Sequence, residues 1–228
     1  MNMKLNSQSG FSLIELVIAM TVTIVIATIA SSLVAQSFHM RAREDTRSDA
    51  IADAQRALNI VTREMANSGF GLADNGVVPG DTGPNAIRFR ANLNAYTRDD
   101  AGEPVAGSEG VFDRDEDIKY VMYNDDAANR HYLVRYDAYI GSTVGQREGT
   151  TVLANRLDSF SLKYFDSAGN ELDVVTTPSA VISAWRVRLT VGVILPAEGQ
   201  SGSPGYQPES TINLVSDVVL RNASQITY

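Results

Sequence analysis

The distribution of apolar residues along the chain changes character near position 40. From Phe11 to Met40 the chain is largely apolar, and Glu15 is the only Asp, Glu, Lys or Arg in this run. As an α-helix, the nineteen residues from Leu16 to Val34 would span about 28 Å, close to the thickness of a bilayer's hydrocarbon core. Their polar residues are all Ser or Thr, whose hydroxyls can bond backbone carbonyls within a helix. Residues 11–40 are therefore predicted to form a membrane-spanning helix.

The helix is predicted to continue beyond the apolar run, because no Pro or Gly occurs between Phe11 and Ser68. Over residues 41–68 the pattern becomes amphipathic, with apolar residues three or four positions apart, the spacing of one helical face. This apolar stripe consists of Ile51, Ala54, Leu58, Val61 and Met65. The other faces carry the charged residues Arg47, Asp49, Asp53, Arg56, Arg63 and Glu64. We expect the stripe to pack on a globular domain and the helix to end before Gly69, a residue suited to a left-handed cap.

After the helix, the pattern indicates a linker and then a β-sheet. Residues 69–85 contain several Gly and Pro turns and form the linker. Apolar and polar residues then alternate in segments around residues 87–93, 120–122, 132–136, 160–164, 185–193 and 211–220. Such alternation is typical of an antiparallel sheet that covers a helix on one side. A long helix followed by strands predicts an α+β fold, with an antiparallel β domain over residues 86–228.

Length, charge and cysteine content limit the classes of protein to which the chain can belong. The chain has 228 residues, which suits one sizeable domain with an appendage. Its net charge of −8 argues against a nucleic acid as partner, because a basic face supplies most of the affinity for phosphate backbones. There is no cysteine, so disulfides and thiolate metal sites are excluded.

The charges that flank the apolar run do not settle the orientation of the helix. Lys4 lies on one side, and Arg41, Arg43 and Arg47 lie on the other. By itself this count favours a cytoplasmic position for the C-terminal domain.

Glu15 is the principal candidate functional residue. A carboxylate in a membrane-spanning helix costs about 2.5–3.5 kcal/mol at the centre of the bilayer and less toward the end, where this residue lies. Such residues usually face a partner rather than lipid. The alternative is a carboxylate near the interface that reaches water on its own.

The acidic segment from Asp113 to Asp117 is a weaker candidate, for a metal ion. Asp113, Asp115 and Asp117 alternate, and carboxylates at that spacing suit Ca²⁺. An EF-hand loop, however, would need Gly where Ile118 stands. We therefore expect a solvated acidic turn and predict neither a metal nor a cofactor.

The sequence contains no pattern that indicates an enzyme. His39 and His131 are the only histidines, and neither lies near a second ligand in the sequence. Ser108, Ser201 and Ser203 lie in Gly-rich stretches but lack the flanking residues of a nucleophile elbow. Five tyrosines fall in the sheet region, where packing is the expected role: Tyr120, Tyr123, Tyr132, Tyr136 and Tyr139.

Residues 10–16, Gly-Phe-Ser-Leu-Ile-Glu-Leu, resemble the processing signal of type IV pilins and of the pseudopilins of type II secretion. In that signal a short polar leader ends in Gly, and Phe and then Glu follow as the first and fifth residues of the mature chain. The resemblance implies that residues 1–10 are a leader, that a prepilin peptidase cuts between Gly10 and Phe11, and that the new amine on Phe11 is methylated.

The same resemblance implies a place and a role for the protein. The subunit would sit in the bacterial inner membrane, with its C-terminal domain outside the cytoplasm, and would then enter a pilus at the cell surface. Its partners would be an inner-membrane assembly platform and other major and minor pilins, which it contacts through its N-terminal helix. In the filament, Glu15 would neutralise the amine at Phe11 of a neighbouring subunit, a pair that tolerates low dielectric better than either charge alone.

Two further stretches point to a subgroup. Residues 41–72 resemble the helix end of PilW-type minor pilins and J-type minor pseudopilins, and residues 157–169 resemble a strand and turn of the same group. Many major pilins carry a helix-breaking Gly and Pro where this chain has Ile24 and Ser32, and most close a C-terminal disulfide loop. The sequence therefore favours a non-catalytic minor pilin that primes or caps a pilus. A J-type pseudopilin and, less strongly, a membrane-anchored adhesin or DNA-uptake protein are the alternatives.

Overall fold

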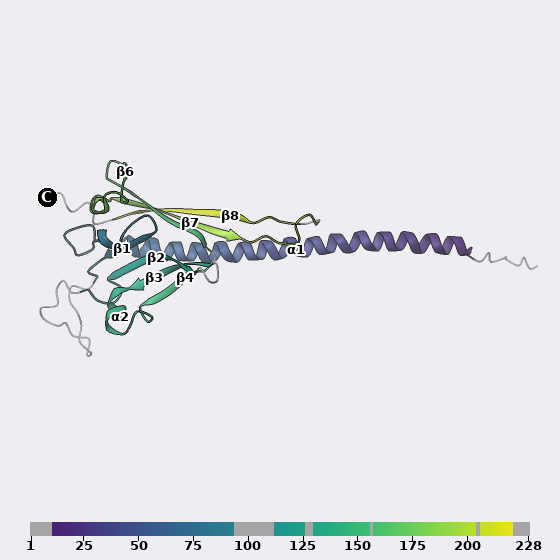
Figure 1. Ribbon diagram of the computed structural model, residues 1–228, viewed down its shortest axis with the longest axis horizontal. Coiled ribbons are helices and arrows are strands. Elements are labelled where there is room, and N and C mark those ends of the chain that lie inside the picture. The colour runs from purple at the N-terminus through teal and green to yellow at the C-terminus, as the bar shows by residue number, and fades with distance from the viewer. Residues whose placement is uncertain (1–10, 94–111, 126–129, 156, 204–205, 221–228) are drawn as a thin grey trace, which may run out of the picture. The chain divides into compact units, whose positions relative to one another are not determined.

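The computed structural model describes residues 11–93, 112–125, 130–155, 157–203 and 206–220. It divides into two compact units, of which the first takes in the residues up to Asp45 and the segment Ala197–Pro208. The second takes in Thr46–Pro196 and the residues from Glu209 onward. One long helix, α1 (Leu13–Met65), contributes to both units, and it confirms the predicted helix with slightly shorter ends (Figure 1).

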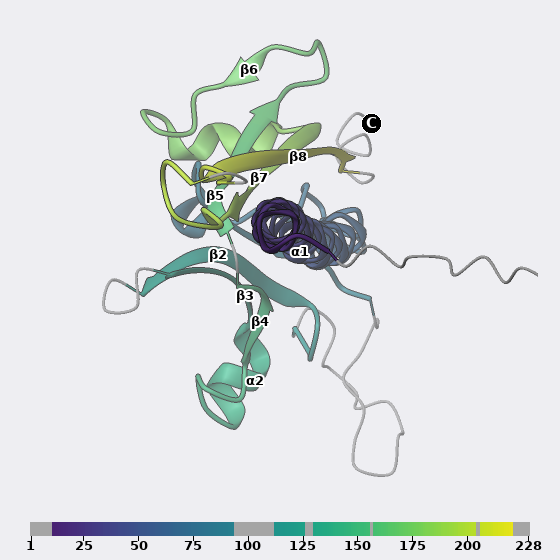
Figure 2. The same ribbon diagram turned by 90° about the vertical axis from the view of Figure 1, so that its right-hand side faces the viewer.

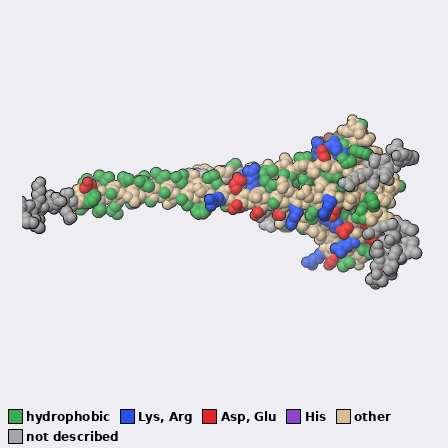
Figure 3. All heavy atoms as spheres, turned by 180° about the vertical axis from the view of Figure 1, so that it is seen from behind, with side chains coloured by type: hydrophobic (Ala, Val, Ile, Leu, Met, Phe, Trp, Pro, Cys, Tyr) green, Lys and Arg blue, Asp and Glu red, His purple; other side chains and the backbone are tan. Residues whose placement is uncertain are grey.

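In the first unit, the apolar part of α1 is exposed along its length. Figure 3 shows hydrophobic side chains over this part of the helix on the face in view. A loop ending at Pro208 belongs to the same unit, and the Arg43 guanidinium donates a hydrogen bond to the Pro208 carbonyl at 2.9 Å. Glu198 and Gln207 pair as a β-bridge within this loop.

The second unit holds two four-stranded antiparallel sheets. The first sheet has the order β1-β2-β3-β4, with β1 at Ala86–Arg90, β2 at Asp117–Asp125, β3 at Arg130–Asp137 and β4 at Thr150–Ala154. The second sheet has the order β6-β5-β7-β8, with β5 at Leu157–Phe165, β6 at Glu171–Leu172, β7 at Arg186–Leu195 and β8 at Ser210–Val219. In the view along α1, the two sheets lie on different sides of the helix (Figure 2). This arrangement confirms the α+β prediction.

One hydrophobic core joins the helix to both sheets. The buried residues of α1 are Ala50, Ala54, Ala57, Leu58, Val61 and Met65. Four of these belong to the predicted stripe, whereas the fifth predicted residue, Ile51, is only half-buried. Three of the buried positions are Ala, whose small side chains let the strands approach the helix closely. The strands complete the core with residues that include Ile87, Tyr120 and Leu133 from the first sheet and Phe160, Leu189 and Val191 from the second.

The end of α1 is held by a glycine-rich segment, as the sequence predicts. The Ser68 hydroxyl donates to the Asn75 carbonyl at 2.6 Å, and the Gly69 N–H donates to the Arg90 carbonyl at 2.9 Å. Gly76 has a φ of +74°, and a Cβ there would lie 2.2 Å from the Arg90 carbonyl oxygen and 2.3 Å from the Gly69 nitrogen. A side chain is therefore excluded at this crossing of the backbone for steric as well as conformational reasons.

Two short 3₁₀ helices occur later in the chain, η1 (Pro79–Asp81) directly after this region and η2 (Pro178–Ser183) before β7. The Asn75 side-chain amide donates to the carbonyls of Val181 and Ala184 at 2.8 and 3.1 Å. The buried amide thus ties the linker after α1 to η2 and to the residue that follows it.

Some features of the sheets were not apparent in the sequence. Three elements lie in stretches where apolar and polar residues do not clearly alternate: the strands β4 and β6 and the helix α2 (Ala138–Thr143). In the alternating segment 132–136, Tyr132, Val134 and Tyr136 share one face of β3, but Leu133 on the other face is the residue that joins the core. Leu93, expected to continue the apolar face of the first strand, is exposed and lies beyond the end of β1.

Candidate functional site

The first turn of α1 brings Ser12 and Glu15 into contact. The Leu16 N–H donates to the Ser12 carbonyl at 3.2 Å, so Ser12 is the residue that caps the helix. Glu15 Oε2 accepts a hydrogen bond from the Ser12 backbone N–H, also at 3.2 Å. This is one half of a capping box, in which a Glu at the third helical position satisfies the N–H of the cap residue. The Ser-x-x-Glu spacing is the sequence signal for this contact, and the prediction for Glu15, which rested on its charge, did not use it.

Of the predicted processing residues Gly10 and Phe11, Phe11 lies beside this turn. Phe11 precedes the helix and is 85% exposed, whereas Gly10 lies outside the described residues. The Glu15 carboxylate is exposed and occupies the end of the helix where the macrodipole favours negative charge. The described end of the chain therefore presents an aromatic residue and a carboxylate together.

Several hydroxyl groups in the apolar part of α1 are hydrogen-bonded within the helix. Thr21, Thr23 and Thr28 each donate to the carbonyl four residues earlier at 2.8 Å. The Ser32 hydroxyl bonds the Ile29 carbonyl at the same distance. Each of these three threonines therefore has a partner for its hydroxyl donor, as an apolar environment requires.

By length and composition, α1 can cross a membrane. Both Ile24 and Ser32, the positions where many major pilins carry helix breakers, lie within the continuous helix.

A second polar contact connects the last turns of α1 to the first sheet. Glu64 Oε2 accepts a hydrogen bond from the Tyr120 hydroxyl at 2.5 Å and another from Arg135 Nε at 2.9 Å. Arg135 also donates to Asp115 at 2.5 Å. Burial, and then the charge of Glu64, raise the pKa of the Tyr120 hydroxyl, so it stays a hydrogen-bond donor. Burial opposes the charge on Arg135, but its hydrogen bond to Glu64 and its other acidic contacts outweigh that effect and raise its pKa.

The sequence pattern placed Glu64 on the polar side of the helix and gave it no partner. Three residues from three separate segments of the chain meet here, so periodicity alone could not reveal the contact. Its role is to hold the β domain on α1.

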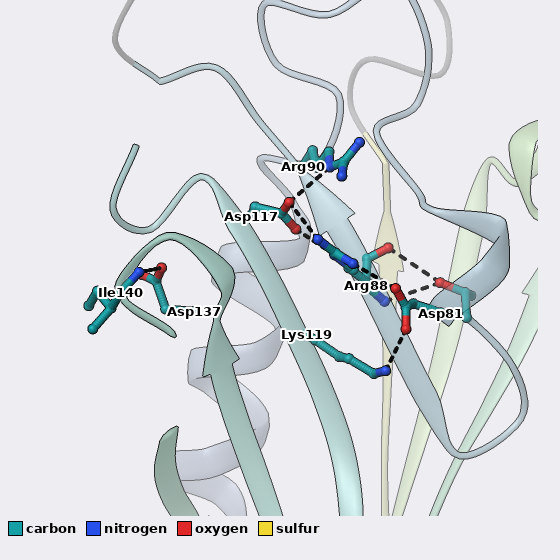
Figure 4. A network of polar contacts seen from close by, with 8 residues as sticks. Asp81, Arg88, Arg90, Asp117, Lys119, Asp137 and Ile140 are labelled. Atoms are coloured by element: carbon teal, nitrogen blue, oxygen red, sulfur yellow. Dashed lines mark hydrogen bonds and ion pairs between the residues drawn. The ribbon is translucent and has the colours of Figure 1, made fainter. Parts of the chain in front are cut away.

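A further network lies on the first sheet and on η1 (Figure 4). Arg88 donates from Nε and Nη2 to the two oxygens of Asp117 at 2.7 and 2.9 Å, and from Nη1 to Asp81 at 2.6 Å. Lys119 Nζ donates to the other oxygen of Asp81 at 2.6 Å, and Arg90 Nε donates to Asp117 at 3.0 Å. The hydrogen bonds from Lys119 and then from Arg88 hold the pKa of Asp81 below its usual range. With five charged groups paired in this way, the network stabilises the edge of the sheet.

The acidic turn does not gather its carboxylates around one point. Asp117 binds Arg88 and Arg90, and Asp115 binds Arg135. Asp113 is held nearby through its N–H, which donates to Glu116 at 2.8 Å. Burial, and then the charge of Glu116, raise the pKa of the Asp113 carboxyl. Within the described ranges, no three acidic or histidine side chains come together as a metal ion would need.

The remaining residues considered from the sequence are dispersed. His39 is exposed on α1, and His131 Nδ1 lies 3.0 Å from the Asn124 side-chain oxygen. The Ser203 hydroxyl donates to the Gln200 carbonyl, and Ser108 lies outside the described residues. These contacts bring no histidine to a serine.

Comparison with known proteins identifies the N-terminal segment. Residues 5–31 match the family described as the prokaryotic N-terminal methylation motif. No curated protein matches the chain. The motif supports a type IV pilin-like protein, either a pilin or a pseudopilin subunit, and therefore a structural role. It also implies processing by a prepilin peptidase and assembly with other pilins, and it is consistent with a membrane anchor.

Proposed function

We propose that this protein is a PilW-type minor pilin, a non-catalytic subunit that primes or caps a type IV pilus. The observation that carries the proposal is the methylation motif at residues 5–31, placed at the start of a helix that can cross a membrane. The restriction to a minor subunit rests on the unbroken helix at Ile24 and Ser32 and on the absence of cysteine.

Each part of the chain has a role in this proposal. Residues 1–10 are the leader, and residues 11–40 hold the subunit in the inner membrane and later pack among the helices of the filament. Residues 41–68 form the amphipathic half of the helix, residues 69–85 form the linker, and residues 86–228 form the β domain outside the cytoplasm.

Cleavage between Gly10 and Phe11 creates a positive amine in an apolar setting. The Ser12 N–H already binds Glu15, so the carboxylate lies at the same helix end as the new amine. In the filament, Glu15 of one subunit neutralises the amine at Phe11 of its neighbour. Each charge is costly when buried alone, so the pair makes assembly sensitive to the axial register of the two helices.

Mass spectrometry of the N-terminus tests the proposal directly. In cells that contain the peptidase, the mature chain should begin at a methylated Phe11, and it should be present in sheared pili. A peptidase-deficient strain is the control and should retain the ten-residue leader. A chain that keeps its leader in the presence of the peptidase would exclude this function.

A further inference from the structure

The loop that joins β7 to β8 lies against the first half of α1. This β7–β8 loop, Ala197–Pro208, forms one compact unit with the residues up to Asp45. One contact with the helix is the hydrogen bond of 2.9 Å from the Arg43 guanidinium to the Pro208 carbonyl. Inside the loop, Glu198 and Gln207 exchange two backbone hydrogen bonds of 2.9 Å, each N–H donating to the other carbonyl.

Gln36 shows how far the β7–β8 loop reaches along the helix. Residues 11–40 are all described, and Gln36 is the one among them that is partly buried rather than exposed. It precedes Arg43 by seven residues, which brings the two to within about 20° of each other around the helix axis. The loop is the only other described segment of this unit, so its tip covers α1 as far as Gln36. The loop therefore overlaps the last residues of the apolar run.

The chemistry of the β7–β8 loop keeps it out of a hydrocarbon core. Its described residues, 197–203 and 206–208, include polar side chains such as Glu198 and Gln200, which lipid tails cannot hydrogen-bond. Irregular backbone exposed to lipid is likewise not tolerated at that depth. Tyr206 in the same loop is of a residue type that is enriched at the level of the headgroups. The hydrocarbon core around α1 must therefore end where the loop begins.

This limit also fixes the other boundary of the core. About 20 helical residues, at about 1.5 Å each, cross a hydrocarbon core about 30 Å thick. Counted back from Gln36, these are residues 16–35, so Glu15 is the first residue beyond the core on the opposite side. The Glu15 carboxylate and the Ser12 N–H that it binds then both lie at headgroup level.

We infer that the β7–β8 loop rests on the lipid headgroups of the leaflet that faces away from the cytoplasm, and that it sets the depth of α1 in the bilayer. This step rests on the proposed function, which takes residues 11–40 as the anchor and places the β domain outside the cytoplasm. The apolar run of thirty residues would be about 45 Å long as a helix, and a run longer than the core can tilt or occupy more than one depth. The loop removes that freedom and keeps Glu15 and the amine created at Phe11 within reach of water until the subunit leaves the bilayer.

The competing arrangement leaves the loop in water, on a solvated part of the helix. The core would then end before Gln36 and begin nearer the N-terminus. A core that ended one turn earlier, at residue 31, would begin at residue 12 and enclose Glu15. Burial of that charge in hydrocarbon is costly, so the depth that brings the loop to the headgroups is favoured.

Quenching of tryptophan fluorescence by brominated lipids tests the position of the loop in the full-length chain. The probe variant combines Tyr206→Trp with Trp185→Phe, which removes the only natural tryptophan. It is reconstituted into vesicles of phosphatidylethanolamine and phosphatidylglycerol that carry bromine either near the glycerol or near the middle of the bilayer. We expect the shallow bromine to quench the probe at position 206 at least twofold more than the deep bromine does.

Two further chains calibrate this measurement. Ile26→Trp with Trp185→Phe lies near the centre of residues 16–35 and should be quenched more by the deep bromine. The natural chain is the matched control, because Trp185 precedes β7 whereas the loop follows it. That strand has ten residues and is therefore about 33 Å long, so neither lipid should quench Trp185.

Shortening the loop tests whether it sets the depth. Deletion of residues 199–203 removes the tip but keeps the bridge between Glu198 and Gln207. Phe38 can then enter the core, so the deep bromine should quench Phe38→Trp with Trp185→Phe at least twofold more in the shortened chain than with the full loop. Phe38 lies about 200° around the helix from Gln36, so this probe does not touch the loop. If circular dichroism shows that the shortened chain does not fold, deletion of residues 200–202 alone should shift the probe in the same direction.

Each part of the inference has a result that would overturn it. Absence of quenching at position 206 by both lipids would place the loop in water, and stronger quenching there by the deep bromine would place it in the core. An unchanged depth of Phe38→Trp after shortening would refute the depth-setting role. If Ile26→Trp is not quenched either, α1 is not in the bilayer and the anchor of the proposed function fails with it. If position 206 alone is not quenched, only the contact with headgroups fails.

Discussion

Glu64 in the last turn of α1 and Arg135 in β3 form an ion pair with 2.9 Å between Oε2 and Nε. The two residues are 71 positions apart in the chain, and both side chains are largely shielded, with 24% and 13% of their surfaces exposed. The Tyr120 hydroxyl shares the same carboxylate oxygen. A contact of this kind connects the β domain to the helix that anchors it.

Removing Arg135 should weaken that connection. Arg135→Ala is expected to lower the free energy of unfolding by about 1–3 kcal/mol, because the shielded Glu64 carboxylate loses a charged hydrogen-bond donor. Urea unfolding followed by the fluorescence of Trp185, the only tryptophan, measures the loss. The control is Lys163→Ala, which breaks an ion pair with Glu171 that is more than half exposed and should cost at most about 1 kcal/mol. Equal losses in the two variants would contradict this role for Arg135.

Acid should destabilise the β domain through Asp81. Its pKa is lowered in the folded protein by hydrogen bonds from Lys119 and Arg88, so the folded state binds fewer protons there than the unfolded state. The stability that the group provides is therefore present above the unfolded value, about 3.9, and is lost as the pH falls through the lower folded value. We expect the urea midpoint to decrease below about pH 4.

Asp81→Asn should remove part of this dependence. The variant should be less stable than the natural protein at pH 7, with the difference narrowing at pH 3. Trp185 fluorescence at a series of pH values provides the measurement. An unchanged difference between the two proteins from pH 7 to pH 3 would show that Asp81 is not responsible.

A side chain at Gly76 should disrupt the end of α1. Gly76→Ala requires a positive φ from an L-residue and puts a Cβ against the Arg90 carbonyl and the Gly69 nitrogen, so a loss of about 1–3 kcal/mol in stability is expected. Gly83→Ala is the matched control, since a Cβ there meets no atom within 4 Å and φ is not positive. It should be neutral or slightly stabilising. If both variants unfold at the same urea concentration, the close approach at Gly76 does not contribute to stability.

The two roles of Glu15 can be separated by its replacement. Glu15→Gln keeps an oxygen that can accept from the Ser12 N–H, as a capping box allows, but it removes the charge. Glu15→Ala removes both the accepting oxygen and the charge. If neutralising the amine at Phe11 drives assembly, the two variants should be depleted from sheared pili to the same extent, at least tenfold, while remaining in the membrane.

Quantitative immunoblots of sheared pili and membranes provide this measurement. Recovery of Glu15→Gln to the natural level would show instead that the helix cap is the important role. Ser32→Ala, which removes a hydroxyl elsewhere in the apolar part of α1, is the control and should leave incorporation unchanged.

Local patterns in the sequence were sufficient for several features. The uninterrupted run from Phe11 to Ser68 predicts the helix, and its apolar and amphipathic parts follow from a period of 3.6 residues. Strand alternation around residues 160–164 and 185–193 predicts β5 and β7, because one face of each strand must be buried. The methylation motif is likewise a short contiguous signal, so the processing residues can be proposed without the tertiary structure.

Contacts between distant segments were decided only by the tertiary structure. Nothing in the sequence near Glu64 indicates Tyr120 or Arg135, because ion pairs depend on how helix and sheet pack. In the same way, β3 buries Leu133 rather than Tyr132 and Tyr136, since strand alternation specifies two faces but not which one meets the core. The positions of β4 and β8 at the ends of their sheets follow from strand order, which is a property of the assembled sheets. The sequence by itself thus determines the long apolar helix and the methylation motif at its start, because both are local patterns, and packing determines how the strands are attached to that helix.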